Sequence, residues 1–545
     1  MKKADIYSTT RLTESYWPAD TSRPLCESTL GDELRKAAAE VPDRLALVEG
    51  ILDAAKRRRW TYAQMLSDAE RVASALLDRF KPGDRVAVQA PNRPEWVLLE
   101  YGCALAGMIL VTVNPANLQR ELEQILETSQ SVALFVIDEY RGDNKLEAAK
   151  KARNNLPFVK EVISFSEFNG FMKSATMSTP FPKVSPKDPL MIIYTSGTTG
   201  VQKGALNHHL GRLNCDYFTV ERAGLEEGGV HINPMPLFHN AGCGCVVVGS
   251  LRMRATHVLL PVFDVALLLN LFESEKGTFS LLVPTMVESI LAFPDRKKYN
   301  LSTWKSFQSG ASYVEKQLIE RCDKELGVCL VNDYGQTEAH GVICGTHRDD
   351  SYEDQSTTIG QPLPQCEVKI ADPETGKVLA LNTEGEICIR GYQVLMAYYH
   401  MPEATAEAFR DGWQRTGDLG RMDERGFLKI TGRLKDMIIR GGENIYPREI
   451  ENLLLEHPKV GQVAVVGVPH PTWGEEVAAV IIPKSSGNLP SPKELHDFCR
   501  ANLTNFKTPR LWCFLNEYPY TQTGKRQNFK LREMIVSGEL KCDRT

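Results

Sequence analysis

A segment rich in glycine and hydroxyl side chains has the composition of a phosphate-binding loop. Residues 195–204 read Thr-Ser-Gly-Thr-Thr-Gly-Val-Gln-Lys-Gly and directly follow an apolar run at 190–194. Glycine lets the backbone approach a polyphosphate closely, N–H and O–H groups can donate to its oxygens, and Lys203 adds positive charge. A Walker A loop needs Gly-Lys-Ser/Thr in direct succession, whereas Lys203 lies three residues after Gly200. We therefore predict a nucleotide site unlike that of P-loop NTPases; a flexible surface loop is the alternative.

The elements that must position this loop alternate between short apolar runs and helical patterns. Strands are expected at 86–89, 108–113 and 190–194, and apolar residues recur at helical spacing over 62–80 and 120–128. This alternation is typical of α/β architecture with largely parallel sheets.

The pattern changes toward the C-terminus. Between about residues 350 and 432, short strands such as 367–371 are separated by glycine and proline, which predicts a small, mostly β region. After Gly432, Pro447 stands where a helix should begin, and two strand-like runs and a second helix follow. We expect a compact α+β unit of about 110 residues, joined to the larger body near residues 433–436.

The composition excludes several classes of protein. A chain of 545 residues allows about three compact units, and a formal net charge of −5 gives no sign of a nucleic-acid partner. The 13 cysteines lack CxxC spacing, so reduced thiols are expected. The N-terminus lacks the apolar core of a signal peptide, and no apolar run approaches the ~18–20 residues that span a bilayer. We expect a cytoplasmic protein with no transmembrane segment.

Residues 194–204 resemble the signature of the acyl-adenylate-forming superfamily, which includes acyl-CoA synthetases, peptide-synthetase adenylation domains and firefly luciferase. The resemblance extends over nearly the whole chain, because further motifs recur in the family's order. It implies a large N-terminal domain of two α/β lobes plus a small β-barrel at 1–434, then a small mobile α+β domain at 435–545. The further motifs are Met235-Pro236-Leu237-Phe238-His239, Tyr334-Gly335-Gln336-Thr337-Glu338, Thr416-Gly417-Asp418, Gly432-Arg433-Leu434-Lys435-Asp436 and the Pro-Tyr-Thr-Gln-Thr-Gly-Lys run that ends at Lys525.

The resemblance implies ATP-dependent conversion of a carboxylic acid to acyl-AMP, with release of pyrophosphate, and transfer of the acyl group to coenzyme A. Two anions must meet, so the site has to supply positive charge and hydrogen-bond donors. Glu338 would hold Mg²⁺, a hard cation that favours carboxylate and phosphate oxygens. Asp418 would accept from the ribose hydroxyls, Arg433 would reach ribose and phosphate, and Thr337 would donate to phosphates. The other ATP-binding positions that it implies are Thr195, Ser196, Gly197, Thr198, Thr199, Gly200 and Lys203 in the loop, and Ser309, Gly310, Ala311, Asp333, Tyr334, Gly335 and Gln336 around the adenine.

Lys525 is the residue on which the implied chemistry depends most. In the family's C-terminal motif this lysine bridges the substrate carboxylate and the α-phosphate of ATP during adenylation. Lys435 matches the hinge between the domains. Rotation there would withdraw Lys525 and present Gly441 and Gly442, whose missing side chains leave room for the pantetheine arm of coenzyme A. A plain turn is the alternative for these two glycines.

His239 matches the place of an aromatic residue that gates the acyl pocket, although a buried core histidine is the alternative. Amino-acid-activating relatives carry an aspartate just after this segment, whereas residues 240–245 include no acid. A neutral or apolar acyl group is therefore expected. His340 either meets a polar substituent of the acid or faces solvent. The pocket positions implied by the resemblance are Asn240, Gly242, Val283, Ser309, Gln336 and Gly341.

Two other functions are compatible with these motifs. One is an enzyme that forms the same adenylate and delivers it to an amine. The other is a catalytically silent relative, against which intact Lys203, Glu338, Asp418 and Lys525 argue. The expected partners are a small carboxylic acid, ATP and coenzyme A, and a homodimer is left open.

Overall fold

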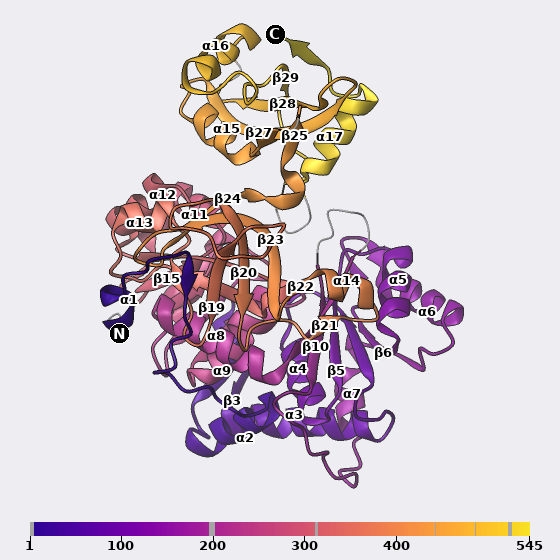
Figure 1. Ribbon diagram of the computed structural model, residues 1–545. Helices are drawn as coiled ribbons and strands as arrows, with labels where there is room; N and C mark the ends of the chain where they lie inside the picture. The colour runs from indigo at the N-terminus through magenta and orange to yellow at the C-terminus, as the bar shows by residue number, and fades with distance from the viewer. Residues whose placement is uncertain (1–4, 196–201, 311–313, 442, 486, 521–525) are drawn as a thin grey trace.

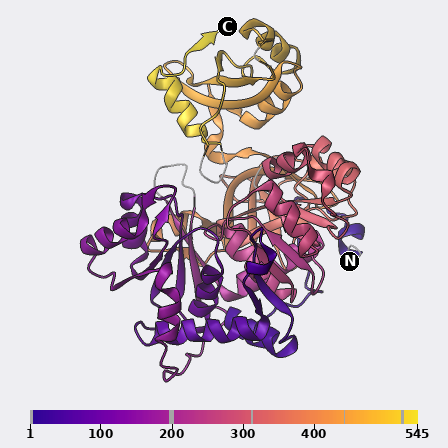
Figure 2. The ribbon, with the colours of Figure 1, turned by 180° about the vertical axis from the view of Figure 1, so that it is seen from behind.

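The computed structural model describes residues 5–195, 202–310, 314–441, 443–485, 487–520 and 526–545 (Figure 1). Two large helix-flanked sheets make up the lower part of the molecule in this view, with a small antiparallel sheet beside them. The C-terminal residues, which come after these three sheets in the chain, form a separate body at the top of the view. Figure 2 shows the same separation from behind.

The first large sheet has nine strands, and its central strands are parallel. Parallel sheets are covered on both faces, which explains the near-continuous apolar runs. The strand order is β18 (Gln361–Pro362), β17 (Gly341–Gly345), β16 (Cys329–Gln336), β15 (Ser306–Ser309), β14 (Phe279–Leu281), β12 (Val230–Asn233), β13 (Thr256–Leu259), β2 (Leu45–Glu49) and β3 (Arg59–Thr61).

The second large sheet has seven strands, of which the inner ones are parallel and two at one edge run antiparallel. Every residue of the two strands over 109–113 and 131–136 is buried. The strand order is β21 (Ala397–Tyr398), β11 (Gly204–His208), β10 (Pro189–Tyr194), β5 (Ile109–Val113), β4 (Arg85–Gln89), β6 (Ser131–Val136) and β9 (Glu161–Ser164).

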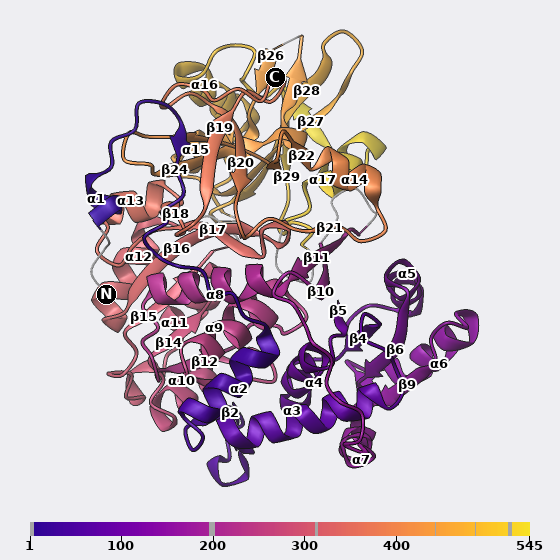
Figure 3. The ribbon, with the colours of Figure 1, turned by 60° about the horizontal axis from the view of Figure 1, so that its bottom comes forward.

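Helices cover these sheets, and three of them, α2 (Leu30–Glu40), α3 (Tyr62–Leu77) and α4 (Pro94–Leu105), pack together (Figure 3). A capping box between Thr61 and Gln64 starts α3. All twelve residues of α4 are buried. The other helices are α1 (Asp5–Thr9), α5 (Gln119–Ser129), α6 (Lys145–Asn155), α7 (Phe168–Lys173), α8 (His209–Ala223), the π-helix η3 (Ala241–Val248), α9 (Gly249–Arg252), α10 (Val265–Ser274), α11 (Pro284–Ala292), α12 (Lys316–Arg321), α13 (Tyr352–Thr357) and α14 (Pro402–Glu407).

The third sheet is antiparallel, as the glycine-punctuated region predicts, and it recruits a strand from the N-terminus. Trp17 of that strand is fully buried, and its ring fills the space that Gly426 leaves open, since a Cβ there would lie 2.2 Å from the ring. The strands are β1 (Tyr16–Trp17), β19 (Glu367–Ala371), β20 (Gly385–Arg390), β23 (Trp413–Met422) and β22 (Phe409–Arg410), with β24 (Leu428–Arg433) paired to β23.

The C-terminal body has its own sheet and its own apolar core. A short helical turn, η7 (Leu434–Asp436), connects it to β24. Its strands are β25 (Ile438–Arg440), β26 (Glu443–Ile445), β27 (Val460–His470), β28 (Gly474–Pro483), β29 (Leu511–Phe514) and β30 (Cys542–Arg544), and its helices are α15 (Pro447–Leu455), α16 (Pro492–Asn502) and α17 (Asn528–Ser537). The chain is thus an α/β protein with an α+β body at its end, as expected from its sequence.

One cysteine expectation is wrong. Cys513 of β29 and Cys542 of β30 are paired across the two strands and form a disulfide, whereas reduced thiols were expected throughout. The pairing depends on the register of an antiparallel strand pair, and the spacing of cysteines along the chain carries no signal of it.

Helices that could cross a membrane are not found in the part of the chain that the structure describes.

Candidate active site

The predicted phosphate loop connects two antiparallel strands. The N–H of Thr195 donates to the carbonyl of Lys203 over 3.0 Å, so the two ends of the loop are held together where β10 and β11 diverge. In a P-loop NTPase a strand runs into a helix instead. The hairpin therefore agrees with the prediction that this is a different kind of loop.

Glu338 lies close to this hairpin, on a short helical turn, η6 (Thr337–Ala339). Its Oε1 accepts a hydrogen bond of 2.8 Å from the hydroxyl of Tyr398. The ammonium of Lys203 lies 4.9 Å from the centre of the same tyrosine ring. Lys203 and Glu338 therefore both contact Tyr398, Glu338 at its hydroxyl and Lys203 at its ring. The motifs did not indicate Tyr398.

The carboxylate of Glu338 is of a kind that fits a magnesium ion shared with a nucleotide. No group of three or more His, Cys, Asp or Glu side chains suited to a metal occurs among the described residues. Mg²⁺ commonly keeps several waters and binds one or two carboxylates together with substrate phosphates, without a full protein cage. Glu338 offers its second carboxylate oxygen for this.

A second cluster lies where the ribose of ATP is predicted to bind. Asp418 of β23 is buried and faces Arg433 of β24 in the strand register, with 2.8 Å between Oδ1 and Nε. Its Oδ2 accepts a hydrogen bond of 2.6 Å from the hydroxyl of Tyr334. Burial and the neighbouring carboxylate raise the pKa of Tyr334 well above its usual range, so it stays a donor. Sequence reasoning selected all three residues but not their mutual contacts.

The residues predicted around the adenine that the structure describes lie at or next to the ends of β15 and β16. Burial raises the pKa of Asp333 to about 7, and Gln308 donates a hydrogen bond to its carboxylate. A Cβ on Gly310 would lie 2.0 Å from Oδ1 of Asp333, so only glycine fits there. Among the described residues Ser309 Oγ finds no hydrogen-bond partner although it is buried.

Four of the predicted acyl-pocket residues, Asn240, Gly242, Gln336 and Gly341, lie near the place where the π-helix η3 meets β17. A Cβ built on Gly341 would lie 3.2 Å from Nδ2 of Asn240. Gly341 has φ of +131°, which side chains rarely adopt. At Gly242 a Cβ would lie 2.1 Å from the carbonyl oxygen of Pro236. Its missing side chain serves backbone packing. Val283 occupies the N-cap position of α11 and is half-buried. Gln336 pairs with Gly341 in the strand register. A Cβ on Gly335 would lie 1.8 Å from the carbonyl oxygen of Gly341.

A buried ion pair that the sequence did not indicate lies behind Asn240. Arg212 and Asp216, one turn apart on α8, are both fully buried and 2.9 Å apart. Arg212 also donates to Oδ1 of Asn240 and to the carbonyl of His340. The guanidinium passes over Gly244, where a Cβ would lie 0.9 Å from it. The pair thus fixes the orientation of the Asn240 amide.

His340 neither faces solvent nor presents a free nitrogen to a substrate. It is fully buried. Its Nε2 accepts from the backbone N–H of His208 over 3.0 Å, and its Nδ1 donates to the carbonyl of Gln393 over 2.8 Å. Burial, with His208 and Arg212 nearby, lowers the pKa of His340 well below its usual range. Both expectations for this residue are therefore wrong, since it joins neighbouring segments as a neutral ring.

His239 stands at the entrance of η3. Its Nδ1 accepts from the N–H of Ala241 over 3.3 Å, and its carbonyl receives the N–H of Gly242 over 2.9 Å. The side chain is half-buried, as a residue at the mouth of a pocket would be.

The predicted hinge and thiol-binding residues lie in and after η7. Burial and the neighbouring Arg433 lower the pKa of Lys435. Gly441 begins the turn between β25 and β26 with φ of +63°, and its N–H donates to the carbonyl of Trp473 over 2.8 Å. A Cβ there would lie 3.0 Å from the Trp473 ring, so a side chain would be strained and crowded.

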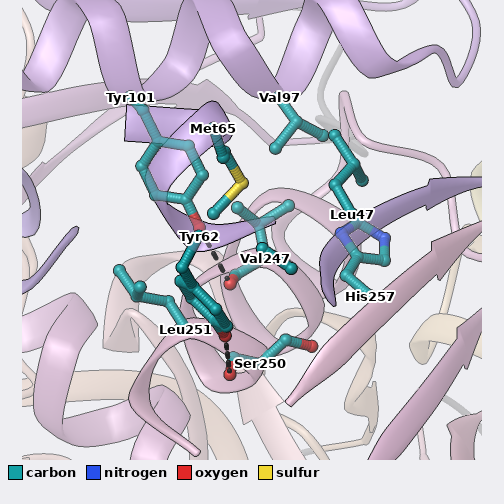
Figure 4. A pocket seen from close by; sticks show the side chains of 10 residues that line it. Leu47, Tyr62, Met65, Val97, Tyr101, Val247, Ser250, Leu251 and His257 are labelled. Carbon is teal, nitrogen blue, oxygen red and sulfur yellow. Dashed lines mark hydrogen bonds between the residues drawn. The ribbon is translucent and has the colours of Figure 1, made fainter. Parts of the chain in front are cut away.

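A small internal cavity lies apart from these residues (Figure 4). Its lining includes Tyr62, Tyr101 and His257, and the two tyrosine hydroxyls donate to backbone carbonyls. None of the predicted site residues lines it. Eight predicted positions lie outside the described residues: Ser196, Gly197, Thr198, Thr199, Gly200, Ala311, Gly442 and Lys525.

The chain belongs to the AMP-binding enzyme family. The family model of that description matches residues 34–399, and a model described as the AMP-binding enzyme C-terminal domain matches 449–525. The sequence resemblance to acyl-adenylate-forming enzymes is thereby confirmed.

Relatives whose names state an activity indicate which class of enzyme within this family the chain resembles. The human medium-chain acyl-CoA ligase ACSF2, mitochondrial, is 36% identical over 558 residues, which cover 96% of this chain and 90% of the relative. ATP-bound MatB from Rhodopseudomonas palustris is 28% identical with a TM-score of 0.83, covering 92% of this chain and 98% of that one. MenE of Bacillus subtilis in complex with the acyl-adenylate OSB-AMP is 28% identical with a TM-score of 0.77, covering 93% and 99%.

The protein is therefore an AMP-forming acyl-CoA ligase. It uses ATP to convert a carboxylic acid to its acyl-adenylate and then transfers the acyl group to coenzyme A.

Proposed function

We propose that the acid is an uncharged, medium-chain carboxylic acid. The observation that carries this proposal is the closed ion pair behind Asn240. Arg212 and Asp216 form an ion pair with each other, and the π-helix η3 beside them has no carboxylate, amine, guanidinium or imidazole side chain. A terminal ammonium or carboxylate on the substrate would lose its water without gaining a partner, which is costly. The chain length is suggested by the name of the human relative.

In the adenylation step, charge has to be balanced at the phosphates. Lys203 and Lys525 supply positive charge to the phosphates and to the substrate carboxylate, and Thr195 and Thr337 donate hydrogen bonds. Glu338 would hold Mg²⁺, whose positive charge would offset the negative charge of the pyrophosphate leaving group. Asp418, Arg433 and Tyr334 hold the ribose; the contacts within this trio support the assignment.

In the thioester step, the carboxyl-terminal residues 435–545 turn about Lys435 and bring Gly441 to the site. The left-handed backbone of Gly441 supports a close approach of the pantetheine arm. His239 at the entrance of η3 gates the thiol. A homodimer and a cytoplasmic location stay predictions of the sequence.

The test compares three acids of equal chain length: octanoate, 8-aminooctanoate and octanedioate. Pyrophosphate release is measured with and without coenzyme A. We expect octanoate to be activated at least about tenfold better, since stranding a charge costs more than 1.4 kcal/mol. Equal activation of either charged acid would contradict the proposal.

The role of Lys525 is tested by Lys525→Ala, with Lys530→Ala, an exposed residue of α17, as the matched control. Loss of charge at the reacting carboxylate should lower pyrophosphate release by about 100-fold or more, and the control should keep wild-type rates. Equal rates for the two variants would refute the assignment.

A further inference from the structure

Tyr398 occupies a two-residue strand that joins two parts of the nucleotide site. The strand, β21, pairs with β11, which leaves the phosphate loop. Backbone hydrogen bonds fix it there: the N–H of Met396 donates to Leu206 over 3.0 Å, and that of Tyr399 to Gly204 over 2.8 Å. On its other side, the N–H of Leu395 donates to the carbonyl of Glu338 over 2.8 Å.

The side chain of Tyr398 makes a separate contact with each charged residue. Its hydroxyl donates to Oε1 of Glu338 over 2.8 Å, and the Lys203 ammonium lies 4.9 Å from its ring centre, within the range of a cation–π contact. The ring is nearly buried, with 9% exposed. A tyrosine hydroxyl is protonated at neutral pH, so it donates this hydrogen bond.

Lys203 and Glu338 carry opposite charges, yet each contacts Tyr398. A direct salt bridge between them would neutralise the cation needed at the phosphates and occupy the carboxylate needed by the metal. A hydroxyl bond to one carboxylate oxygen fixes the rotamer of Glu338 and leaves the other oxygen for the ion. Residues that orient a metal ligand from behind typically change metal affinity by about 10–100-fold when they are removed.

We propose that Tyr398 is a positioning residue for both halves of the MgATP site. Its hydroxyl orients Glu338 for Mg²⁺, and its ring holds Lys203 beside the phosphate loop. This inference rests on the proposed roles of Glu338 and Lys203.

The experiment measures, as functions of free Mg²⁺, both pyrophosphate release at fixed ATP and the equilibrium binding of ATP in the absence of acid by calorimetry, for Tyr398→Phe and for Tyr399→Phe. Tyr399 is the next residue, half-buried, and stacks on His400. Tyr398→Phe keeps the ring and loses the hydroxyl. We expect its half-saturating Mg²⁺ concentration to rise about 10–100-fold, with an unchanged KM for the acid, and we expect Tyr399→Phe to match wild type.

Tyr398→Leu removes the ring as well, and it should also raise the KM for ATP at saturating Mg²⁺, because Lys203 loses its support. An unchanged Mg²⁺ dependence in Tyr398→Phe, or an equal rise in the KM of the acid, would overturn the inference. Denaturant unfolding of each variant identifies any loss of rate that comes from misfolding.

Glu338→Gln separates this inference from the proposed function. If Glu338→Gln shifts the Mg²⁺ dependence and Tyr398→Phe does not, the role of Tyr398 is wrong while the metal role of Glu338 stands. If Glu338→Gln leaves the dependence unchanged, the proposed metal site itself is wrong. In the double variant, Tyr398→Phe should have no further effect, since its hydroxyl acts through the lost carboxylate.

Discussion

Replacing Asp418 by asparagine removes the charge at the centre of the proposed ribose site while keeping its shape. An ionised carboxylate has about four lone-pair positions. Arg433 and Tyr334 each occupy one of them, so two remain for the two ribose hydroxyls. The amide of asparagine has one acceptor oxygen, and its NH₂ cannot accept a bond. The ribose hydroxyl that donates to the replaced oxygen therefore loses its acceptor.

The size of the effect follows from this count. A hydrogen bond to a charged acceptor contributes about 1.5–3 kcal/mol, and 1.4 kcal/mol corresponds to tenfold in affinity. Losing one such bond should raise the KM for ATP by about 10–150-fold. The free energy of unfolding should change much less, by about 1 kcal/mol or under, because the Arg433 side chain is 33% exposed and solvent screens the pair.

The assay measures initial rates of pyrophosphate release against ATP concentration, at saturating acid and Mg²⁺, with unfolding midpoints as a check on folding. Asp497→Asn is the control, because this aspartate lies on the exposed face of α16, where it pairs only with neighbouring side chains. The reasoning is refuted if Asp418→Asn folds normally and its KM for ATP stays within about twofold of the control.

Three further predictions concern stability and the second half-reaction. Arg212→Met strands the buried carboxylate of Asp216 and should lower the free energy of unfolding in urea by about 3–5 kcal/mol; a loss under about 1 kcal/mol would contradict the burial of this pair. Burial lowers the pKa of His209 to about 4, below its unfolded value of about 6.5, so the unfolded state binds the extra proton and stability falls as pH drops from 6.5 toward 4. His209→Asn should therefore reduce the slope of unfolding free energy between pH 6 and 5 by about 1 kcal/mol per pH unit, and an unchanged slope would argue against a neutral buried ring. Gly441→Val forces a branched side chain into left-handed backbone against Trp473 and should slow thioester formation by about 5–30-fold, with acyl-adenylate formation unchanged; equal slowing of both steps would remove Gly441 from the thiol path.

The parts of the fold that sequence patterns predicted are those governed by local periodicity. Buried parallel strands read as apolar runs, and the run at 190–194 became β10 within one residue of its predicted start. The strand at Tyr16–Trp17 was missed because two residues carry no periodicity, and only Gly426, far along the chain, makes room for its tryptophan.

Site residues could be predicted where they belong to a continuous sequence motif. Contacts between site residues could not be predicted where they depend on how two strands are aligned. Asp418 and Arg433 belong to motifs, but their pairing across β23 and β24 follows from strand alignment. Tyr398 reaches Glu338 from 60 residues away in sequence, through a strand too short to be recognised. Arg212 was overlooked because nothing in the sequence marks it as buried.

The most direct test of the central claim follows one oxygen atom. The acid is supplied with ¹⁸O in both oxygens of its carboxylate, together with ATP, Mg²⁺ and coenzyme A. The mass of the nucleotide product is then measured by mass spectrometry. Attack of the carboxylate on the α-phosphorus and later attack of the thiol on the acyl carbon leave one carboxylate oxygen on the phosphate of AMP. We predict AMP that carries one ¹⁸O, formed in equal amount with the acyl-CoA thioester. Unlabelled AMP, or ADP with labelled inorganic phosphate, would contradict the account.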